Sequence, residues 1–414
     1  MFAAALAAAV FAAEAAGRPA GPADAEPVPS PAPDSAMHAL RVANWNVENL
    51  FDAVENQEKD PETQKAPDWE FTPQSWRHWT ESRYRTKLER LAWAIDKMKP
   101  DVLAVEEVEN RATVDALVET LREKHGWTLP HVAHEESNDH RGIDVAILSR
   151  YPIVSQRYLP KTGPRGLLRA DVDADGARLV VFALHWKSQL GDKSVNAAVR
   201  RNEAESLRKA FADALAENPD AAIVALGDYN EMVNGLAQVS GLETVETRAE
   251  ALESANAGPE GFRPYNLVND IPEERRGTFF WNQSHAWNTL DGIIVAPRML
   301  LPAEESGPVW RASDPAATAG FAVPEMRWHD GRPNAYRRSR KYASGSGGDE
   351  VEGETSYTGY SDHFPLVTVL ARVEQAAPAA ADETAEEAPA PESAEESTAP
   401  EAAAEDGEEA AQAA

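Results

Sequence analysis

The residues of this chain that could do chemistry are carboxylates, amides and histidines placed at the ends of apolar runs. Asp362 and His363 stand side by side just before one such run, and Asp228 and Asn230 close another. A carboxylate is costly to bury unless it is paired or bound to a cation, so a gathering of such groups indicates a metal site, although each residue alone could be structural. The full set is Asn44, Asn46 and Glu48, Glu106 and Glu107, His185, Asp228 and Asn230, Asp291, and Asp362 and His363.

The composition restricts the metal that such a site would hold. The chain of 414 residues contains no cysteine, which excludes disulfides, thiolate nucleophiles and cysteine-based zinc sites. Oxygen and imidazole ligands remain, and they favour Mg²⁺, with Mn²⁺ or Ca²⁺ as alternatives, before zinc. The expected cofactor is therefore Mg²⁺.

An α/β domain is predicted to position these residues. Nearly all-apolar runs alternate with segments whose apolar residues recur at helical spacing, and such strands lie inside a sheet that is covered on both faces. Strands are predicted over 40–47, 101–108, 143–149, 178–186, 221–230, 290–296 and 364–371, and helices around 88–98, 114–121 and 197–215, the second ended by Gly126.

The polar strand ends belong to longer segments that resemble the endonuclease/exonuclease/phosphatase superfamily, which includes deoxyribonuclease I, abasic-site endonucleases, sphingomyelinases and inositol polyphosphate phosphatases. The segments occur in the family's order, and the chain is similar to a bacterial, deoxyribonuclease I-like member. The resemblance implies a four-layered α/β sandwich of two packed mixed β-sheets flanked by helices. The matching segments are NWNVENLFD (44–52), PDVLAVEEVEN (100–110), GIDVAILSRYPI (142–153), VFALHWKS (181–188), LGDYNE (226–231), WNTLDGIIV (287–295) and GYSDHFPL (359–366).

The resemblance implies a metal site built around Glu107. This residue matches the family's metal-binding glutamate, and one carboxylate with water and phosphate oxygens is the usual way of holding Mg²⁺. Asn46 matches an amide that helps to hold metal or phosphate, and Glu48 and Asp362 match metal-site carboxylates of family members. Glu106 occupies the neighbouring non-ligand position and is expected to point to the other face of its strand.

The same resemblance implies catalytic roles for residues of the later segments. Asp228 matches the aspartate that positions or deprotonates the attacking water, and Asn230 matches the amide that binds the scissile phosphate. His363 matches the catalytic imidazole opposite the leaving group. Asp291 is its expected partner, because a carboxylate on one ring nitrogen fixes the tautomer and raises the basicity of the other nitrogen.

A second histidine, His185, stands where deoxyribonuclease I has the one usually given the general-acid role. Two histidines can divide the proton transfers, one helping water to attack and the other protonating the departing oxygen. His185 could instead be a hydrogen-bonding residue at a strand end. Lys187 is expected to contact phosphate, as are Arg200 and Arg201, although the last two could equally lie on a solvated helix face.

Two segments, 57–87 and 299–358, are interpreted as insertions relative to the family. The first carries tryptophans among basic residues, a pattern that fits either base stacking or anchoring by packing. The second carries a basic cluster that is expected to bind a polyanion. The residues concerned are Trp69, Trp76 and Trp79 in the first segment, and Arg337, Arg338, Arg340 and Lys341 in the second.

The implied reaction is hydrolysis of a phosphoester by in-line attack of water, with Mg²⁺ stabilising charge on the phosphoryl oxygens. The first hypothesis is an exported nuclease, a Mg-dependent phosphodiesterase acting on DNA or RNA. The second keeps the chemistry but changes the substrate to a lipid headgroup or a small phosphoester, as in sphingomyelinases, which carry exposed apolar loops for the membrane surface. The third is an inactive family member that serves as a binding module.

Both ends of the chain are predicted to lie outside the folded domain. Residues 1–16 are apolar and Ala-rich and contain a small-x-small pattern, which indicates a signal peptide and a secreted or periplasmic protein; a cytoplasmic location is the alternative, because no basic residue precedes Arg18. Residues 17–37 are interpreted as a disordered Pro/Ala-rich linker, 38–373 as the family domain and 374–414 as a disordered acidic tail, which holds much of the formal charge of −29. No transmembrane segment is expected in the mature chain, and the protein is expected to be a monomer.

Overall fold

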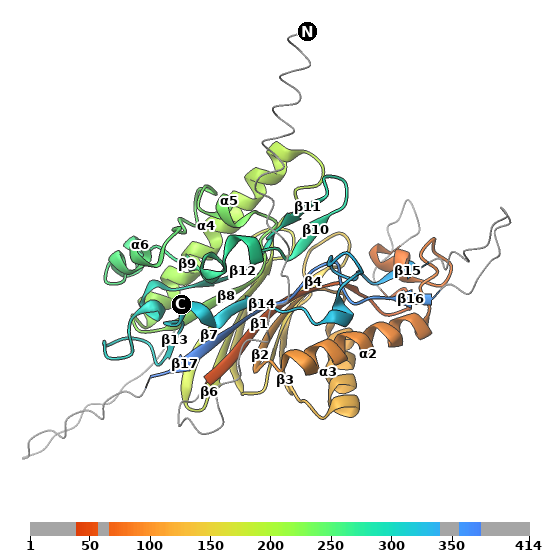
Figure 1. The fold of residues 1–414 in the computed structure, drawn as a ribbon, viewed down its shortest axis with the longest axis horizontal. Helices are drawn as coiled ribbons and strands as arrows, with labels where there is room; N and C mark the ends of the chain where they lie inside the picture. The colour runs from red at the N-terminus through yellow and green to blue at the C-terminus, as the bar shows by residue number, and fades with distance from the viewer. Residues whose placement is uncertain (1–38, 57–65, 340–355, 374–414) are drawn as a thin grey trace, which may run out of the picture. The chain divides into compact units, whose positions relative to one another are not determined.

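The computed structural model describes residues 39–56, 66–339 and 356–373. Two mixed β-sheets form the centre of this part of the chain (Figure 1). The first sheet runs in the order β13 (Trp310–Arg311), β17 (Leu366–Arg372), β1 (Ala39–Leu50), β2 (Val102–Val108), β4 (Asp144–Ser149) and β3 (His131–His134), and β14 (Thr318–Gly320) also pairs with β17. The second runs in the order β5 (Ile153–Leu159), β6 (Leu167–Ala174), β7 (Ala177–His185), β8 (Ala222–Asp228), β12 (Asp291–Val295) and β9 (Tyr265–Asn266).

Helices and two hairpins complete the described part. The hairpins pair β10 (Phe279–Trp281) with β11 (Ala286–Asn288) and β15 (Arg337–Ser339) with β16 (Ser356–Thr358). The α-helices are α2 (Glu81–Met98), α3 (Arg111–His125), α4 (Lys193–Glu217), α5 (Val233–Leu236), α6 (Arg248–Glu253) and α7 (Gly258–Gly261). Short 3-10 helices are η1 (Pro67–Phe71), η2 (Leu267–Asp270), η3 (Glu273–Arg275), η4 (Pro297–Leu300), η5 (Pro315–Ala317) and η6 (Pro324–Met326).

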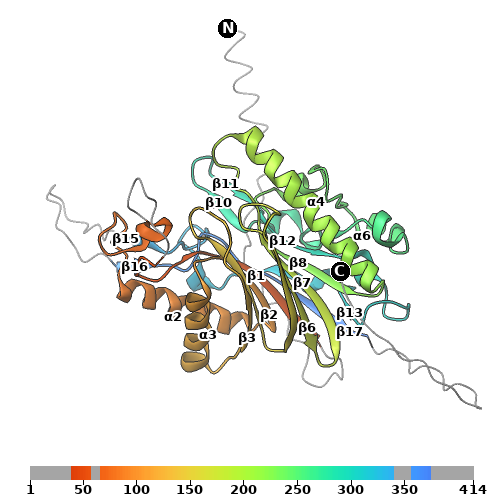
Figure 2. The same cartoon turned by 180° about the vertical axis from the view of Figure 1, so that it is seen from behind.

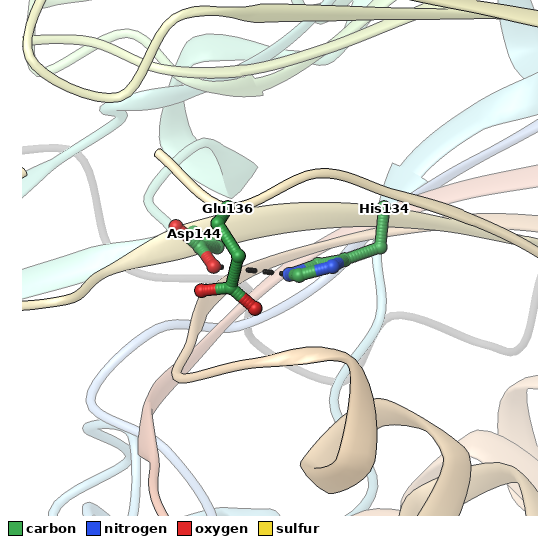
Figure 3. Close-up of side chains that lie close together, drawn as sticks. All are labelled: His134, Glu136 and Asp144. Atoms are coloured by element: carbon green, nitrogen blue, oxygen red, sulfur yellow. Dashed lines mark hydrogen bonds and ion pairs between the residues drawn. The ribbon is translucent and has the colours of Figure 1, made fainter. Parts of the chain in front are cut away.

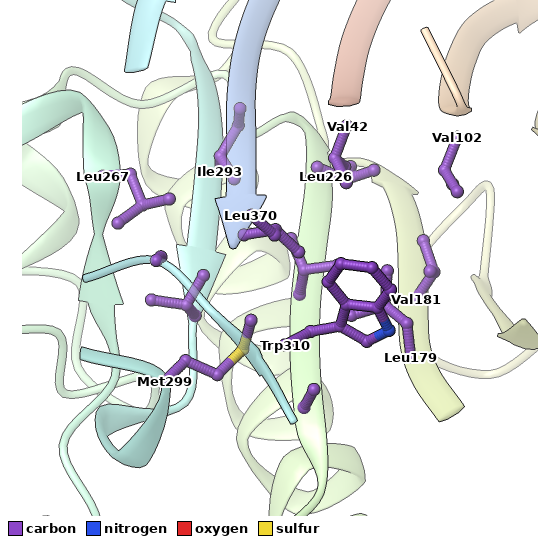
Figure 4. Close-up of a cluster of buried hydrophobic side chains, with 14 of the residues drawn as sticks. Val42, Val102, Leu179, Val181, Leu226, Leu267, Ile293, Met299, Trp310 and Leu370 are labelled. Atoms are coloured by element: carbon purple, nitrogen blue, oxygen red, sulfur yellow. The ribbon is translucent and has the colours of Figure 1, made fainter. Parts of the chain in front are cut away.

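The two sheets pack face to face, and helices cover their outer faces (Figure 1; Figure 2). An apolar core between the sheets contains Val42 of the first sheet and Val181 of the second (Figure 4). A second core joins the outer face of the first sheet to α2 and α3, and it contains Trp45 of β1 and Leu91 of α2. A third core packs Phe211 of α4 against the second sheet. The predicted four-layered α/β sandwich is confirmed.

The strands that the sequence missed lack a continuous apolar run. Side chains of β5 are largely exposed, because this strand lies at the edge of its sheet. In β6 the apolar run is interrupted by Arg169 and Asp171, which form a buried ion pair with Nε and Oδ1 2.8 Å apart. The predicted strands and helices form close to their expected positions, and α3 ends at Gly126 with a φ of 71°.

Part of the segment interpreted as the first insertion packs onto the domain. Trp79 is buried, donates from Nε1 to the carbonyl of Phe51 (3.0 Å) and meets the ring of Tyr336 edge-on at 5.8 Å. Trp76 is 63% exposed, and the guanidinium of Arg77 lies 4.3 Å from its ring centroid. Of the two roles expected for these tryptophans, Trp79 has the packing role.

The strand ends that carry the polar residues meet at one edge of the sandwich. Because β1 is parallel to β2 and β7 is parallel to β8, the carboxyl ends of each pair lie together. β12 is antiparallel to β8 and places Asp291 opposite Asp228, and β17 places Leu366 opposite Asn44. The segment before β17, which carries His363, therefore reaches the same edge.

Within the described ranges, none of the helices combines the length and the apolar character that a membrane span requires. The predicted signal peptide, the linker and the acidic tail lie outside the described residues. Their boundaries stay predictions.

Candidate active site

The strand ends leave the sheets through residues in the left-handed region of backbone conformation. The φ angle is 53° at Glu48, 63° at Glu107 and 49° at Asn230, and the pairing of β1 and β2 is irregular at the first two. Such a conformation costs a non-glycine residue about 1–3 kcal/mol and persists only where its surroundings hold it. It also breaks the alternation of a strand, so these side chains turn towards the edge where the site lies.

One side-chain amide joins the two sheets at this edge. Nδ2 of Asn46 donates to Oε1 of Glu107 (3.3 Å) and to Oδ2 of Asp228 (3.2 Å). Its Oδ1 accepts from the backbone N–H of Glu48 at 3.0 Å. Residues that are far apart in the sequence are therefore gathered in a single polar cluster.

Two imidazoles flank Asp228. Nε2 of His185 lies 3.6 Å from Oδ2 of Asp228, and Nε2 of His363 lies 3.9 Å from the same oxygen. The other ring nitrogen of His363, Nδ1, is 2.8 Å from Oδ2 of Asp291, a distance at which the ring N–H donates to the carboxylate. The backbone N–H of His363 donates to Oγ of Ser361 at 3.0 Å. Asp291 therefore holds the ring and Ser361 holds the backbone of the same residue.

Burial and neighbouring charges set the protonation of these groups. Burial lowers the pKa of His185 well below its ordinary 6.5, and Arg165 lowers it further, so this imidazole is neutral near pH 7. Burial would also lower the pKa of His363, but Asp291 and Asp228 raise it well above 6.5. Burial raises the pKa of Asp228 to about 7 against the opposing effect of His363. The ring of His185 can therefore accept a proton, and the ring of His363 can donate one.

The expected metal ligands lie around a lysine that no motif indicated. Nζ of Lys87 on α2 donates to the backbone carbonyl of Glu48 at 2.5 Å. Burial lowers the pKa of Lys87 to about 8, and the carboxylates of Glu48, Asp362 and Glu107 oppose that shift. Oε2 of Glu48 accepts from the backbone N–H of Tyr336 at 2.8 Å. Lys87 lies among apolar helix positions, so only the packing of α2 reveals the residue's neighbours.

These donors fit a hard divalent cation. Carboxylate and amide oxygens are the ligands that Mg²⁺ prefers, and one or two carboxylates with water and substrate oxygens suffice to hold it. The Asn46 amide donates to Glu107, which has a left-handed backbone, and the charges of Glu48, Glu107 and Asp362 all act on Lys87. Glu107, with Glu48 and Asp362 beside it, would hold the ion.

Glu106 lies on the face of β2 opposite to Leu103 and Val105, as expected for the non-ligand position, and this face is buried beneath the site. It continues the alternation of Val102 and Ala104, which face the second sheet, and it is fully buried. Neither carboxyl oxygen has a hydrogen-bond partner among the described residues. Burial, with Asp291 and Asp228, raises the pKa of Glu106 well above 4.5, so the group keeps its proton. The left-handed conformation turns residue 107 out of the strand, whereas residue 106 stays in it.

Replacing Glu106 by Gln is expected to remove a loss of stability that the wild-type protein shows as the pH rises. An unfolded glutamate ionises near 4.5, whereas the buried carboxyl keeps its proton to higher pH, so the folded state binds more protons across that window. Wild-type stability therefore falls as the pH rises above 4.5, by up to about 1.4 kcal/mol per pH unit for one proton. Thermal unfolding in EDTA from about pH 5 to about pH 8 should be less steeply pH-dependent in Glu106→Gln. Parallel curves for the two proteins would contradict this.

The structure separates the expected phosphate contacts. Asn230 lies in the polar cluster, where its backbone N–H donates to Oδ1 of Asp228 (2.8 Å) and its Nδ2 to the carbonyl of Trp186 (3.0 Å). Lys187 is half-buried and follows the strand that ends in His185. The side chain of Arg338 lies outside what the structure describes.

Arg200 matches neither interpretation offered for it. Its side chain is buried, pairs with Oε1 of Glu231 at 3.2 Å and donates to the carbonyl of Lys187 at 3.0 Å. Arg200 therefore holds the start of α4 to the loop after β7, whereas Arg201 is exposed. Alternating charges in the sequence do not show which arginine faces inward.

Arg141 is a further basic residue whose charge acts on His185, and no sequence motif indicated it. Nη2 of Arg141 donates to Oδ1 of Asn49 (3.1 Å), and the charge of Arg141 contributes to the lowered pKa of His185. The loop that carries it is anchored by a buried ion pair, with Oδ2 of Asp139 3.3 Å from Nε of Arg165. An exposed guanidinium is thus held within electrostatic range of the imidazole.

An aromatic hairpin adjoins the other imidazole. Phe279 of β10 forms an isolated β-bridge with His363, and the two ring centroids are 4.9 Å apart. The ring centroids of Trp281 and Phe279 are 5.9 Å apart, and those of Phe280 and Trp287 of β11 are 5.3 Å apart. The four aromatic side chains of the hairpin are half-buried. The clustered Phe and Trp residues of this segment were the sequence pattern that could have indicated the feature.

A second group of potential metal ligands lies on β3, β4 and the loop between them. Figure 3 shows His134, Glu136 and Asp144 together, and one ligand atom from each lies within 4.8 Å of the others, which makes them the one such group among the described residues. Asp144 is already 3.0 Å from Nε2 of His134 and accepts from the backbone N–H of Ser137 at 2.7 Å. These hydrogen bonds give the buried His134 and Asp144 partners within the protein. A bound ion is therefore not needed to account for the group.

Comparisons with known proteins give a family match and several similar folds. The Endonuclease/Exonuclease/phosphatase family matches residues 41–372. Among solved structures, an endonuclease/exonuclease/phosphatase family protein from Bacteroides thetaiotaomicron is 13% identical, with 82% of this chain and 99% of that chain covered and a TM-score of 0.44. Truncated TDP2 from Caenorhabditis elegans is 14% identical (80% and 97% covered, TM-score 0.44), and a Bacteroides thetaiotaomicron mannosyl-6-phosphatase is 14% identical (80% and 99%, TM-score 0.44). No curated protein matches the sequence.

Proposed function

This chain belongs to the endonuclease/exonuclease/phosphatase family, and on that premise we propose that it is a divalent-metal-dependent hydrolase of nucleic-acid phosphodiesters. The observation that carries the proposal is the surroundings of Asp228. The Asn46 amide links this carboxylate to Glu107, and two imidazoles of different protonation flank it. A metal ligand, a proton-accepting carboxylate and two imidazoles are the parts that attack of water on a phosphoester uses.

Each residue of the cluster has a role that its geometry allows. Asp228, with a pKa of about 7, would orient the attacking water and accept its proton near neutral pH. His363, held by Asp291, would act at the departing oxygen, and the neutral ring of His185 would accept or relay a proton beside it. Asn230 would contact the scissile phosphate. When bound, the divalent ion would stabilise negative charge on the phosphoryl oxygens.

The surroundings of the two imidazoles support a nucleic-acid substrate. Phe279 lies beside His363 and Trp281 lies beside Phe279, and aromatic faces stack on bases with little dependence on sequence. Arg141 lies near His185, where a guanidinium suits a phosphate next to the scissile one. A phosphodiester flanked by bases and further phosphates would use both features, whereas a small phosphomonoester would use neither.

The same hairpin supports a second candidate, hydrolysis of a lipid-headgroup phosphodiester. Its half-buried Phe280 and Trp287 could enter the interfacial region of a membrane. The third hypothesis, an inactive binding module, predicts no turnover of any phosphoester.

Hydrolysis is expected to require a divalent ion and to favour nucleic acid. The purified protein should cleave plasmid DNA or RNA and bis-p-nitrophenyl phosphate in Mg²⁺ or Mn²⁺, and EDTA should abolish both activities because the carboxylates alone do not stabilise the phosphoryl charge. Sphingomyelin vesicles serve as the competing substrate. Turnover of lipid alone would replace the proposal with the second candidate, and no turnover of any substrate would leave the binding module.

Export of the protein and a monomeric state are also proposed, and they rest on the sequence alone. The apolar segment 1–16 supports export. Fractionation of cells that express the full chain, with N-terminal sequencing of the product, would test it. An uncleaved product in the cytoplasmic fraction would overturn the export, and light scattering would test the monomer.

A further inference from the structure

The described part of the segment 57–87 presents one tryptophan ring to solvent. Trp76 is 63% exposed, whereas Trp79 is 5% exposed and packs into the domain. A single exposed apolar side chain is common on protein surfaces and by itself indicates no function. Trp76 differs from such a residue because charged and aromatic neighbours hold its ring in place.

Trp76 is the outer member of a row of stacked groups. The guanidinium of Arg77 lies over the indole ring, 4.3 Å from its centroid, and over the ring of Phe71 at 4.8 Å. The rings of Phe71 and Phe51 are stacked, with centroids 4.0 Å apart and an interplanar angle of 14°. Phe51 is fully buried in the second core. The row therefore connects an exposed indole to the interior of the domain.

Arg77 is itself fixed by its neighbours. Its Nε and Nη2 both donate to Oε2 of Glu70, at 3.2 Å and 3.1 Å, and its carbonyl accepts from Nη1 of Arg83 at 2.8 Å. Fixing an exposed side chain costs conformational entropy, and burial of Trp76 does not offset that cost. A ring that is already held in place loses less freedom when a ligand binds, so the arrangement favours recognition.

The row ends beside the candidate metal site. Phe51 directly follows β1, and its carbonyl accepts from Nε1 of Trp79 at 3.0 Å. Trp79 meets the ring of Tyr336, whose backbone N–H donates to Oε2 of Glu48 at 2.8 Å. Trp76 and the expected metal ligand Glu48 are therefore attached to the same strand end.

We propose that Trp76 is a stacking subsite for a base of single-stranded nucleic acid, apart from the nucleotides that flank the scissile phosphate. Bases of every kind stack on an indole, and a neighbouring guanidinium suits the phosphate backbone. Three contacts of 4.0–4.8 Å separate Trp76 from Phe51 at the strand end, so the base belongs to a more distant nucleotide. The inference rests on the proposed nucleic-acid substrate and adds a preference for long strands.

The surroundings of Trp76 favour a base over a membrane surface. Among the residues of this segment that the structure describes, Trp76 is the one large apolar side chain that is exposed, and the ion pair of Arg77 with Glu70 lies beside it. A membrane interface is bound through several apolar side chains that enter it together. A single indole with a charged neighbour matches a single base.

The test is the binding of fluorescein-labelled single-stranded DNA in Mg²⁺, followed by fluorescence anisotropy. The full chain carrying His363→Asn serves as the background, so that the DNA is not cleaved during the measurement. Adding Trp76→Ala should weaken the binding of a strand of about 12 nucleotides roughly tenfold, the loss of one stacked base. A strand of about 3 nucleotides should bind as before, and Trp76→Phe should keep most of the affinity for the longer strand.

Trp328→Ala in the same background is the matched control. Trp328 is 41% exposed and contacts His329, with ring centroids 5.6 Å apart, and it takes no part in the row. This substitution should leave the affinity for both strands unchanged. Equal affinity for the longer strand with and without Trp76, or equal losses for both lengths, would overturn the proposal.

Two further outcomes are distinct from these. Binding of sphingomyelin vesicles that depends on Trp76, with no effect on DNA, would overturn the proposal in favour of a membrane surface. If the background protein binds neither strand, the nucleic-acid substrate itself fails, which differs from tight binding of DNA that does not depend on Trp76.

Discussion

Replacing His363 by Asn is expected to lower kcat/KM for phosphodiester hydrolysis by on the order of 10³-fold, because asparagine can neither carry the charge nor transfer a proton. The ring is held 2.8 Å from Oδ2 of Asp291 and faces Asp228 with its other nitrogen at 3.9 Å. Initial rates should be compared on plasmid DNA and on bis-p-nitrophenyl phosphate. If His363 protonates the leaving oxygen, the loss should be larger on DNA, whose alkoxide leaving group needs the proton more.

His125→Asn is the matched control for this substitution. His125 closes α3, with Nδ1 3.9 Å from Oδ2 of Asp96, and it takes no part in the polar cluster. The control should keep wild-type activity, and both variants should retain the wild-type circular dichroism spectrum. A His363→Asn protein that keeps more than about a tenth of the activity would remove this residue from the reaction.

Glu107→Gln and Glu106→Gln, adjacent in the sequence, are expected to differ by roughly 10²-fold in activity at limiting Mg²⁺. Glu107 accepts from the Asn46 amide at the strand end and is the expected metal ligand, so its amide variant should bind Mg²⁺ weakly. Glu106 is buried behind it and protonated, so glutamine reproduces its charge and shape. Activity should be measured across a Mg²⁺ titration.

The concentration dependence separates a lost ligand from a damaged fold. Excess Mg²⁺ should restore part of the activity of Glu107→Gln, since only one ligand is missing, and Glu106→Gln should follow the wild-type curve throughout. A loss confined to Glu106→Gln would exchange the roles assigned to these residues, and equal losses in the two variants would contradict the difference between them.

Local patterns in the sequence were sufficient for the class of fold and for most of the cluster. Nearly all-apolar strands that alternate with amphipathic helices indicate an α/β domain, because buried faces repeat at the period of the strand or helix. The sandwich of two sheets was implied by the family resemblance. Polar residues such as Asp228 and His363 stand at the ends of those runs. Because an unpaired charge is costly to bury, their presence there indicates a site. The convergence of these ends follows once neighbouring strands are parallel, as β7 and β8 are.

Only the tertiary structure decided which side chains contact one another in the site. A single left-handed residue turns Glu107 out of the strand and leaves Glu106 beneath the site, and no periodicity reports such a change. Lys87 and Arg141 carry no motif, and their positions depend on how a helix and a loop pack against distant strand ends. Sequence patterns therefore determined which residues must be buried or polar, whereas the charge around each carboxylate was decided by contacts between segments far apart in the chain, because electrostatic energy depends on distance in space.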